Sequence, residues 1–250
     1  AMRGFDVTIY DKNGQAGGQV IAASSGIHKD KLYWAIEDLM TAVKKLGVKV
    51  VLGREVLLED IRYLNPYAVI VATGGTPMRP GFIPGINNEN VITANDVLLK
   101  EYELENMRLV VIGSGMTGLE TTEYLNEYGN DVTVVEMADE IAPGAWFQLV
   151  DDAMERISRF NTKFMTSTKL CSIDEEGVLV ENIKTGEKLK LKADAVVLAM
   201  GVKSDRLLSH QIESYGFRTY RVGDADKSGT IAHACHSAYD TAMKIGKWGW

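Results

Sequence analysis

The sequence is poor in cysteine and in clustered positive charge, and both shortages exclude classes of protein. Its 250 residues include only Cys171 and Cys235, which form neither a C-x-x-C pair nor a metal-ligand pattern. Isolated cysteines are typical of proteins in a reducing compartment, so we expect a cytoplasmic location. The formal net charge is −7 and the basic runs are short and interleaved with acids, which argues against a nucleic-acid-binding surface.

Long hydrophobic runs are missing as well. No apolar run approaches the roughly 18 residues that a membrane span requires, and no signal peptide is evident, so we expect no membrane partner. The whole sequence is 46% hydrophobic and 24% charged, and it contains 24 glycines and five prolines. This is an ordinary globular composition, and the chain is long enough for one large core or two smaller ones.

Strand-like and helical runs alternate along the chain. Residues 7–10 and 48–52 read as strands, and residues 31–46 have apolar positions at the 3–4 spacing of an amphipathic helix. The run "AVIVA" at 68–72 is entirely apolar, which predicts a strand buried on both faces of a parallel sheet.

The second half repeats this alternation. Residues 108–137 read as strand, glycine turn, helix and strand, and a further helix is expected at 146–159. Four short strands, an apolar strand and a closing alanine-rich helix follow, near 162–167, 169–174, 177–183, 187–192, 195–199 and 231–245. The whole pattern predicts a doubly wound α/β architecture.

One glycine motif has the full context of a dinucleotide-binding turn. Gly113, Gly115 and Gly118 form G-x-G-x-x-G directly after an apolar strand, and Glu136 ends the next strand 23 residues after Gly113. Gly113 permits the tight turn, Gly115 lets a pyrophosphate approach the backbone, and Gly118 lets the helix pack on the strand. The helix N-terminus, with Met116 and Thr117, would offer free N–H groups to the phosphates.

Glu136 also bears on the choice of dinucleotide. Its carboxylate can accept hydrogen bonds from ribose hydroxyls but would repel a 2′-phosphate, and no Arg or Lys follows in "MADEIA". We therefore expect NAD, with NADH preferred over NADPH. The alternative is a glycine turn that binds nothing.

Weaker signals are scattered along the rest of the chain. Asp11 ends the first strand, and glycine turns or strand ends follow it at three other places: Gly18 and Gln19, Thr73 and Gly74, Gly223 and Asp224. Separately each is only a turn, but together they suggest a second nucleotide site split across the sequence.

The order of these motifs carries a resemblance. The chain resembles the pyridine nucleotide-disulfide oxidoreductase superfamily of flavoproteins with two Rossmann-like dinucleotide-binding domains. It is most similar to the C-terminal half of the NADH:flavin oxidoreductases related to 2,4-dienoyl-CoA reductase and trimethylamine dehydrogenase. "RGFDVTIYDKNGQAGGQVIAA", "AVIVATGGTPMRPGFIPG", "NVITANDVL" and "VGDA" carry the likeness.

The resemblance implies roles for the scattered residues and a domain division. Asp11 would bind the adenosine ribose of FAD, Gly18 and Gln19 would line the flavin side, Thr73 and Gly74 would pass close to the nucleotide, and Asp224, beside Gly223, would hold the ribityl or pyrophosphate portion. An FAD-type domain would span 1–104 and 193–250, with an NAD-type domain inserted at 105–192.

The sequence also departs from the family. It has no redox cysteine pair, so it resembles the branch that passes electrons from NADH through flavin to another centre, which in the closest relatives is an FMN and an iron–sulfur cluster in a separate barrel. The first strand and glycine turn of the FAD-type domain are missing too. We therefore expect FAD binding to be weak or absent, with unpaired strand edges near 7–10 and 68–72 that favour a homodimer or a rearranged sheet.

Two further observations keep alternatives open. Glu120 lies early in the helix after the glycine turn, where it would either contact the nicotinamide, as the family pattern implies, or occupy the helix surface. His233 and His236 flank Cys235 at i, i+3, but no partner motif suggests a metal, so ordinary helix residues are expected.

The sequence thus predicts a flavin-linked oxidoreductase module that passes hydride from NADH to FAD and on to an acceptor outside this chain. No acid–base residue is expected, because binding and orientation by the protein suffice for hydride transfer between cofactors. The rival hypothesis is a non-catalytic nucleotide-binding module or a fragment of a larger flavoenzyme.

Overall fold

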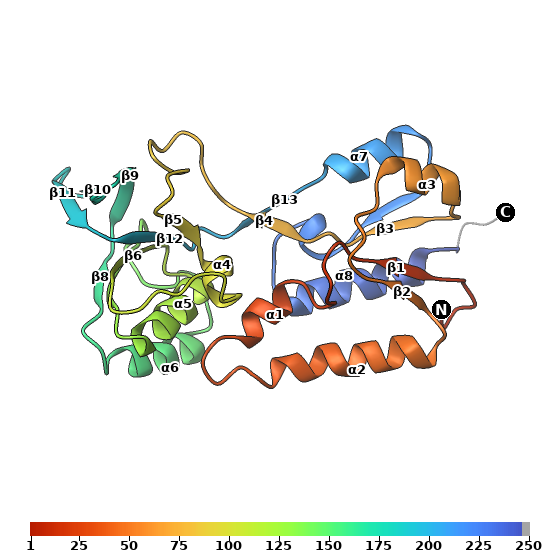
Figure 1. Cartoon of the computed structure of the whole chain (residues 1–250), viewed down its shortest axis with the longest axis horizontal. Helices are drawn as coiled ribbons and strands as arrows, with labels where there is room; N and C mark the ends of the chain where they lie inside the picture. Colours follow the sequence, from red (N-terminus) through yellow and green to blue (C-terminus); the bar gives the residue numbers. More distant parts are fainter. Residues whose placement is uncertain (247–250) are drawn as a thin grey trace. The chain divides into compact units, whose positions relative to one another are not determined.

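A computed structural model describes residues 1–246; residues 247–250, which include Trp248 and Trp250, lie outside the described residues. The chain forms two compact units (Figure 1). The first consists of Ala1–Ile21, Lys31–Thr76 and Val202–Trp250, and the second of Ala22–Asp30 and Pro77–Gly201. The second unit contains the predicted NAD-type range and extends beyond it on both sides; the domain assignment itself stays a prediction.

A five-stranded parallel sheet organises the second unit. Its strand order is β5-β12-β6-β7-β8, with β5 (Val91–Thr93), β6 (Arg108–Ile112), β7 (Asp131–Val135), β8 (Lys163–Met165) and β12 (Ala195–Leu198). Nearly every residue of β6 and β12 is buried, as expected for strands that are covered on both faces.

Each face of this sheet has its own apolar cluster, because successive side chains of a strand point to opposite faces. Leu109 and Val111 of β6 pack on the helical side with Leu125, whereas Val110 and Ile112 pack on the other side with Val178. Three helices belong to this unit: α4 (Ala94–Leu98), α5 (Met116–Glu127) and α6 (Phe147–Ile157).

The layer on the other face is a three-stranded antiparallel sheet. Its order is β11-β10-β9, from β9 (Thr168–Asp174), β10 (Gly177–Asn182) and β11 (Lys188–Lys192). These are three of the four short strands that the sequence predicted, each shifted by one residue at one end. The unit therefore has three layers of antiparallel sheet, parallel sheet and helices.

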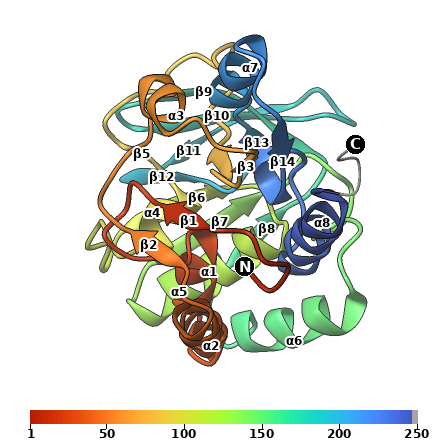
Figure 2. The same cartoon turned by 90° about the vertical axis from the view of Figure 1, so that its right-hand side faces the viewer.

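The first unit contains three separate pairs of strands. β1 (Thr8–Tyr10) lies parallel to β2 (Lys49–Val51), β3 (Val69–Val71) lies parallel to β14 (Thr219–Arg221), and β4 (Gly75–Pro77) pairs with β13 (Val202–Ser204). Its helices are α2 (Leu32–Lys45), α3 (Leu58–Leu64), α7 (Leu207–Ser214), α8 (Ile231–Lys244) and the 3₁₀ turn η1 (Gly223–Ala225) (Figure 2). In the sequence, α1 (Gln19–Ser24) spans the boundary between the first and second units.

The expectation that the strand at 68–72 is buried on both faces was wrong. Ile70 is 47% exposed, whereas Val71 is 4% exposed. Within residues 1–246, β3 pairs with β14 alone, and this leaves Ile70 about half exposed. The helix predicted at 31–46 is confirmed as α2; Ile36 is its one buried residue, and Leu39 is 63% exposed.

Candidate nucleotide-binding site

The glycine turn lies at the carboxyl end of β6, where the chain order of the sheet reverses. From β6 the chain continues through β7 to β8 on one side, whereas β12 lies on the other side. Such a reversal is where open α/β sheets bind ligands, since the loops after the two central strands diverge there. The main chain draws the two strand ends together, because the Ala199 N–H donates to the Ile112 carbonyl at 2.8 Å.

The three glycines of the motif have different surroundings. Gly113 has φ +104°, and a Cβ there would lie 2.5 Å from the Ala199 carbonyl oxygen. A Cβ at Gly118 would lie 2.2 Å from the Gly113 carbonyl oxygen, so this glycine lets α5 pack on the turn. At Gly115 a Cβ would meet no atom within 4 Å. Gly113 and Gly118 are therefore required by packing, whereas Gly115 borders open space.

The N-terminus of α5 fits an anionic ligand. Gly115 is the N-cap residue and provides no side-chain cap, so the first turn, with Met116 and Thr117, has no side-chain acceptor for its N–H groups. The first four N–H groups of a helix lack partners within the helix, and the helix dipole adds partial positive charge there. Open space at Gly115 next to these donors matches a pyrophosphate, so the residues present fit the dinucleotide.

Glu136 is anchored to the same turn. Its Oε2 accepts hydrogen bonds from the Ser114 N–H at 2.8 Å and the Ser114 hydroxyl at 2.9 Å, and its Oε1 accepts from the Ala138 N–H at 2.8 Å. Burial alone would raise the pKa of Glu136, but these hydrogen bonds outweigh it and lower the pKa. The carboxylate is therefore ionised at neutral pH, and it lies directly behind the glycine turn.

Glu120 forms an ion pair on α5. The Lys29 ammonium group donates a hydrogen bond to the Glu120 carboxylate, whose side chain is 15% exposed. Lys29 comes from the segment Ala22–Asp30, which belongs to the second unit although it is remote in sequence. The pair therefore fixes this segment to the helix that starts at the glycine turn.

The residues predicted for FAD all lie in the first unit. β3 is followed by Thr73 and Gly74, and its partner β14 is followed by Gly223 and Asp224. Because the two strands are parallel, both turns lie at the same end of the pair, next to the carboxyl ends of the strands. Gly74 has φ +76° with no atom within 4 Å of a Cβ position, which leaves room for a ligand. An Asp224 carboxylate oxygen accepts a hydrogen bond from the Gly229 N–H at 2.9 Å.

The other predicted FAD residues belong to the β1 side of the unit. Asp11 follows β1, and its carboxylate accepts a hydrogen bond from the Asn13 N–H at 2.9 Å. Gly18 has φ +52° and open space at its Cβ position, and Gln19 begins α1. Groups for a ribose and for the middle of a dinucleotide are thus present.

A cradle for the FAD phosphates is not found in the described part of the first unit. After β1, β3 and β14 the chain enters irregular loops or the short turn η1, so no glycine turn leads directly from a parallel strand into a long helix there. The residues present therefore fit FAD in part.

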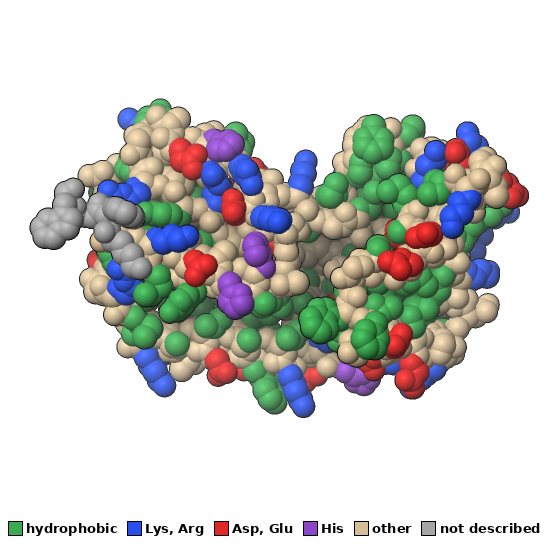
Figure 3. Space-filling model, turned by 180° about the vertical axis from the view of Figure 1, so that it is seen from behind, with side chains coloured by type: hydrophobic (Ala, Val, Ile, Leu, Met, Phe, Trp, Pro, Cys, Tyr) green, Lys and Arg blue, Asp and Glu red, His purple; other side chains and the backbone are tan. Residues whose placement is uncertain are grey.

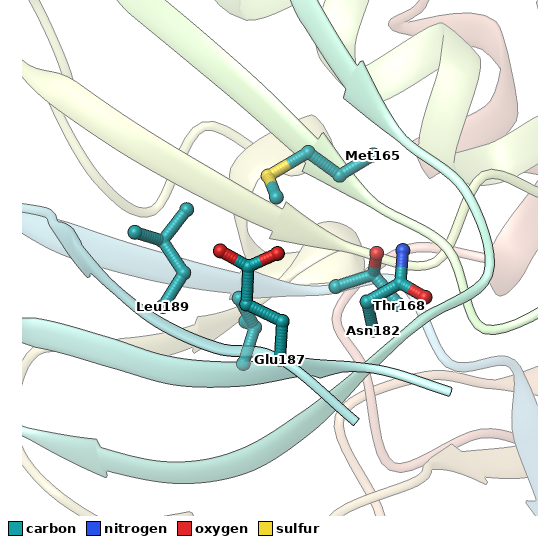
Figure 4. Close-up of a pocket in the computed structure, with 6 residues that line it drawn as sticks. Met165, Thr168, Asn182, Glu187 and Leu189 are labelled. Carbon is teal, nitrogen blue, oxygen red and sulfur yellow. The ribbon is translucent and has the colours of Figure 1, made fainter. Parts of the chain in front are cut away.

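Other features lie apart from these residues. The described residues contain no group of three or more His, Cys, Asp or Glu side chains placed to hold a metal, and none of their helices is both long and apolar enough to cross a membrane. A cavity of about 140 Å³ lies between β8 and the antiparallel sheet, with Met165, Thr168 and Glu187 among its lining residues (Figure 4). This is smaller than the roughly 300 Å³ of a typical small-ligand pocket.

Two residues of the site were missed by sequence reasoning. Ser114 is fully buried, and its hydroxyl also accepts a hydrogen bond from the Ala142 N–H at 3.1 Å, so it ties the glycine turn to the loop after β7. A hydroxyl residue inside the motif was a usable signal. Lys29 gave no such signal, because its partner Glu120 lies 91 residues away.

Comparisons with known proteins agree across the chain. The family model described as pyridine nucleotide-disulphide oxidoreductase matches residues 2–227. The chain is 34% identical to a bilirubin reductase of Mediterraneibacter gnavus, covering 96% of this chain and 37% of that protein. It is 35% identical to an NADH oxidase of Thermoanaerobacter brockii, covering 98% of this chain and 38% of that protein.

Solved structures give the same result. A 2-naphthoyl-CoA reductase, solved in complex with 2-naphthoyl-CoA, superposes with a TM-score of 0.90 at 29% identity, covering 98% of this chain and 37% of that chain. The chain thus spans less than two-fifths of the length of these relatives. The likeness to this structure, together with the parallel sheet of the second unit, confirms the predicted α/β fold class of Rossmann-like dinucleotide-binding domains.

Proposed function

The chain belongs to the pyridine nucleotide-disulphide oxidoreductase family, and from that premise we propose that it is the electron-input module of a flavin-linked oxidoreductase. In this proposal NADH binds at the glycine turn of the second unit and FAD is associated with the first unit. The acceptor, an FMN and an iron–sulfur cluster in a separate domain, lies outside this chain. The observation that carries the proposal is the open space at Gly115 beside the uncapped N-terminus of α5.

The chain's own residues would bind and orient the dinucleotide. The N–H groups of Met116 and Thr117 would donate hydrogen bonds to the pyrophosphate, and Gly115 would leave room for it. Glu136, held ionised by Ser114 and Ala138, would accept a ribose hydroxyl and repel a 2′-phosphate, which favours NADH over NADPH. When bound, NADH supplies a hydride for reduction of FAD, and no acid–base residue is needed.

Glu120 and Lys29 would border the nicotinamide end of the site. Glu120 lies one turn into α5, beyond the N–H groups that would hold the phosphates, and its pairing with Lys29 holds the segment Ala22–Asp30 beside it. The pair would thereby set the position of the segment that faces the reactive end of the dinucleotide.

A second candidate is a nucleotide-binding module without catalysis. The missing phosphate cradle in the described part of the first unit favours it, because FAD held only by Asp11, Thr73, Gly74 and Asp224 would be bound weakly. The two candidates share the NADH site and differ in whether this chain retains flavin.

One preparation separates them. Protein reconstituted with FAD and desalted is examined for flavin absorbance, for NADH binding by calorimetry, and for NADH oxidation with ferricyanide as artificial acceptor. A yellow protein that oxidises NADH supports the electron-input module. A colourless protein that binds NADH supports the non-catalytic module, and a protein that binds no NADH contradicts both.

A further inference from the structure

The hydrogen bonds to Glu136 are shared unequally between its two carboxylate oxygens. Oε2 accepts from both the main-chain N–H of Ser114 at 2.8 Å and its hydroxyl at 2.9 Å, whereas Oε1 accepts from the Ala138 N–H at 2.8 Å. An ionised carboxylate offers about four lone-pair sites, two on each oxygen. Oε2 is therefore filled by groups of the chain itself.

The other oxygen has at most one acceptor site to offer. On Oε1 the Ala138 N–H occupies one of the two lone pairs. The Met137 N–H also lowers the pKa of Glu136, as the smallest of the hydrogen bonds that do so. A ligand hydroxyl therefore finds no more than one open lone pair on this carboxylate, and that lone pair belongs to Oε1.

Main-chain bonds hold the carboxylate and the Ala138 donor in place. The Glu136 N–H donates to the Met165 carbonyl at 2.9 Å, and the Glu136 carbonyl accepts from the Thr168 N–H at 2.8 Å. The Ala138 carbonyl accepts from the Ser167 N–H at 2.6 Å. The backbone on which this carboxylate stands is thus fixed to the chain that joins β8 to β9.

The Ser114 hydroxyl is fixed as well. Ser114 is fully buried, and its Oγ accepts a hydrogen bond from the Ala142 N–H at 3.1 Å while it donates to Glu136. Turning the hydroxyl away from Glu136 would break a hydrogen bond in a fully buried place, where an unsatisfied donor is costly. Ser114 therefore keeps Oε2 occupied when a ligand arrives.

Neutral donors alone orient this carboxylate. Acidic and basic side chains are mixed on the surface of the second unit, which is the right-hand part of Figure 3. Within residues 1–246, however, no Lys, Arg or His side chain forms an ion pair with Glu136. The hydrogen bonds from Ser114 and Ala138 therefore decide which lone pair a ligand can reach.

We propose that Ser114 restricts Glu136 to one hydroxyl of the adenosine ribose. Oε1 accepts a hydrogen bond from one of the two neighbouring ribose hydroxyls, and the other hydroxyl makes no hydrogen bond to Glu136. A carboxylate with one open lone pair on each oxygen would instead accept from both. Ser114 is thus a positioning residue that sets ribose specificity through Glu136. This inference rests on the proposed function, because it requires a dinucleotide at the glycine turn.

The direct test uses two NADH analogues, one without the 2′-hydroxyl and one without the 3′-hydroxyl of the adenosine ribose. Each is titrated by calorimetry into the unsubstituted chain and compared with NADH. We expect one analogue to bind about tenfold more weakly, because it loses a hydrogen bond to a charged acceptor. The other analogue should bind within about twofold of NADH, because the hydroxyl that it lacks makes no bond to Glu136.

Ser114→Ala should change this pattern. Without the hydroxyl, each oxygen of Glu136 keeps one N–H donor and gains or keeps one open lone pair. The analogue that the unsubstituted chain tolerates should then bind about tenfold more weakly than NADH. A merely structural role of Ser114 would weaken NADH and both analogues by the same factor. If Ser114→Ala does not fold, Ser114→Cys serves in its place, since a thiol is a weak donor.

Thr121→Val is the matched control for the loss of a buried hydroxyl. Thr121 is also fully buried in the second unit, and its hydroxyl donates to the Thr117 carbonyl at 2.7 Å. Valine removes this hydroxyl at similar volume and leaves every donor to Glu136 in place. The affinities of the two analogues relative to NADH should therefore equal those of the unsubstituted chain.

Three results would overturn the inference. These are equal losses for both analogues in the unsubstituted chain, no loss for either analogue, and relative affinities that Ser114→Ala or Ser114→Cys leaves unchanged. Each of them is observed with NADH bound, so each leaves the proposed dinucleotide site standing. No binding of NADH by the unsubstituted chain would overturn the proposed function and this inference together.

Discussion

Replacing Gly115 by valine should remove dinucleotide binding while the fold persists. The position is the N-cap of α5 and has no atom within 4 Å of its Cβ direction, so the added side chain enters open space. That space is also where we place the pyrophosphate. The substitution therefore separates the binding site from the packing of the turn.

The two effects differ in size. Valine is a poorer N-cap residue than glycine, which should lower the free energy of unfolding by about 1 kcal/mol. Loss of charge-assisted hydrogen bonds from the turn to the phosphates should weaken binding by about 3 kcal/mol, or on the order of 100-fold. The binding effect is thus expected to exceed the stability effect clearly.

Gly118→Ala is the matched control in the same motif. Its Cβ would lie 2.2 Å from the Gly113 carbonyl oxygen, so the helix must shift and the fold should lose about 1–3 kcal/mol. Calorimetric titration with NADH and urea unfolding are measured on both variants. Normal NADH binding by Gly115→Val would refute our placement of the phosphates, and unfolding of Gly115→Val but not of Gly118→Ala would refute our assignment of the two glycines.

Four further outcomes follow from the site. Glu136→Arg should narrow or reverse the preference for NADH, and titration showing tighter NADPH binding by the unsubstituted protein would contradict the role of Glu136. The folded-state pKa of Glu136 is lowered from 4.5, so the ionised carboxylate stabilises the fold above pH 4.5 and this stabilisation is lost as the pH falls through the folded-state pKa. Glu136→Gln should therefore make the free energy of unfolding fall less steeply with acid, as measured by urea unfolding from pH 6 downward. Lys29→Met should lower the free energy of unfolding by about 1 kcal/mol, because it leaves Glu120 unpaired, and adding Glu120→Gln should restore most of that loss. If the effects of the two substitutions on the free energy of unfolding simply add, the ion pair contributes nothing. Desalting after incubation with FAD should leave less than stoichiometric flavin, and full retention by a monomer would show that the described residues suffice for FAD.

The second unit could be predicted from sequence because its signals are local. Strand, turn, helix and acid follow one another within 108–137, and the glycines at 113, 115 and 118 have the surroundings that their order in the motif indicates. β6, α5 and β7 accordingly lie where the sequence placed them. The closing helix α8 was predicted for the same reason.

The first unit was harder because its relations are remote. The pairing of β3 with β14 joins residues about 150 positions apart, and the contact of Lys29 with Glu120 spans 91. An apolar run such as "AVIVA" indicates a strand but does not say whether both of its faces are covered, so the exposure of Ile70 could not be predicted. Whether scattered turns share one ligand likewise depends on sheet order, which sequence periodicity does not report.

The central claim is that a nicotinamide dinucleotide binds at the turn Gly113–Gly118. A crystal structure of the protein soaked with NAD tests it most directly. The account predicts pyrophosphate oxygens within hydrogen-bond distance of the Met116 and Thr117 N–H groups and a ribose hydroxyl on Glu136. A dinucleotide bound elsewhere, with this turn empty at saturating ligand, would contradict it.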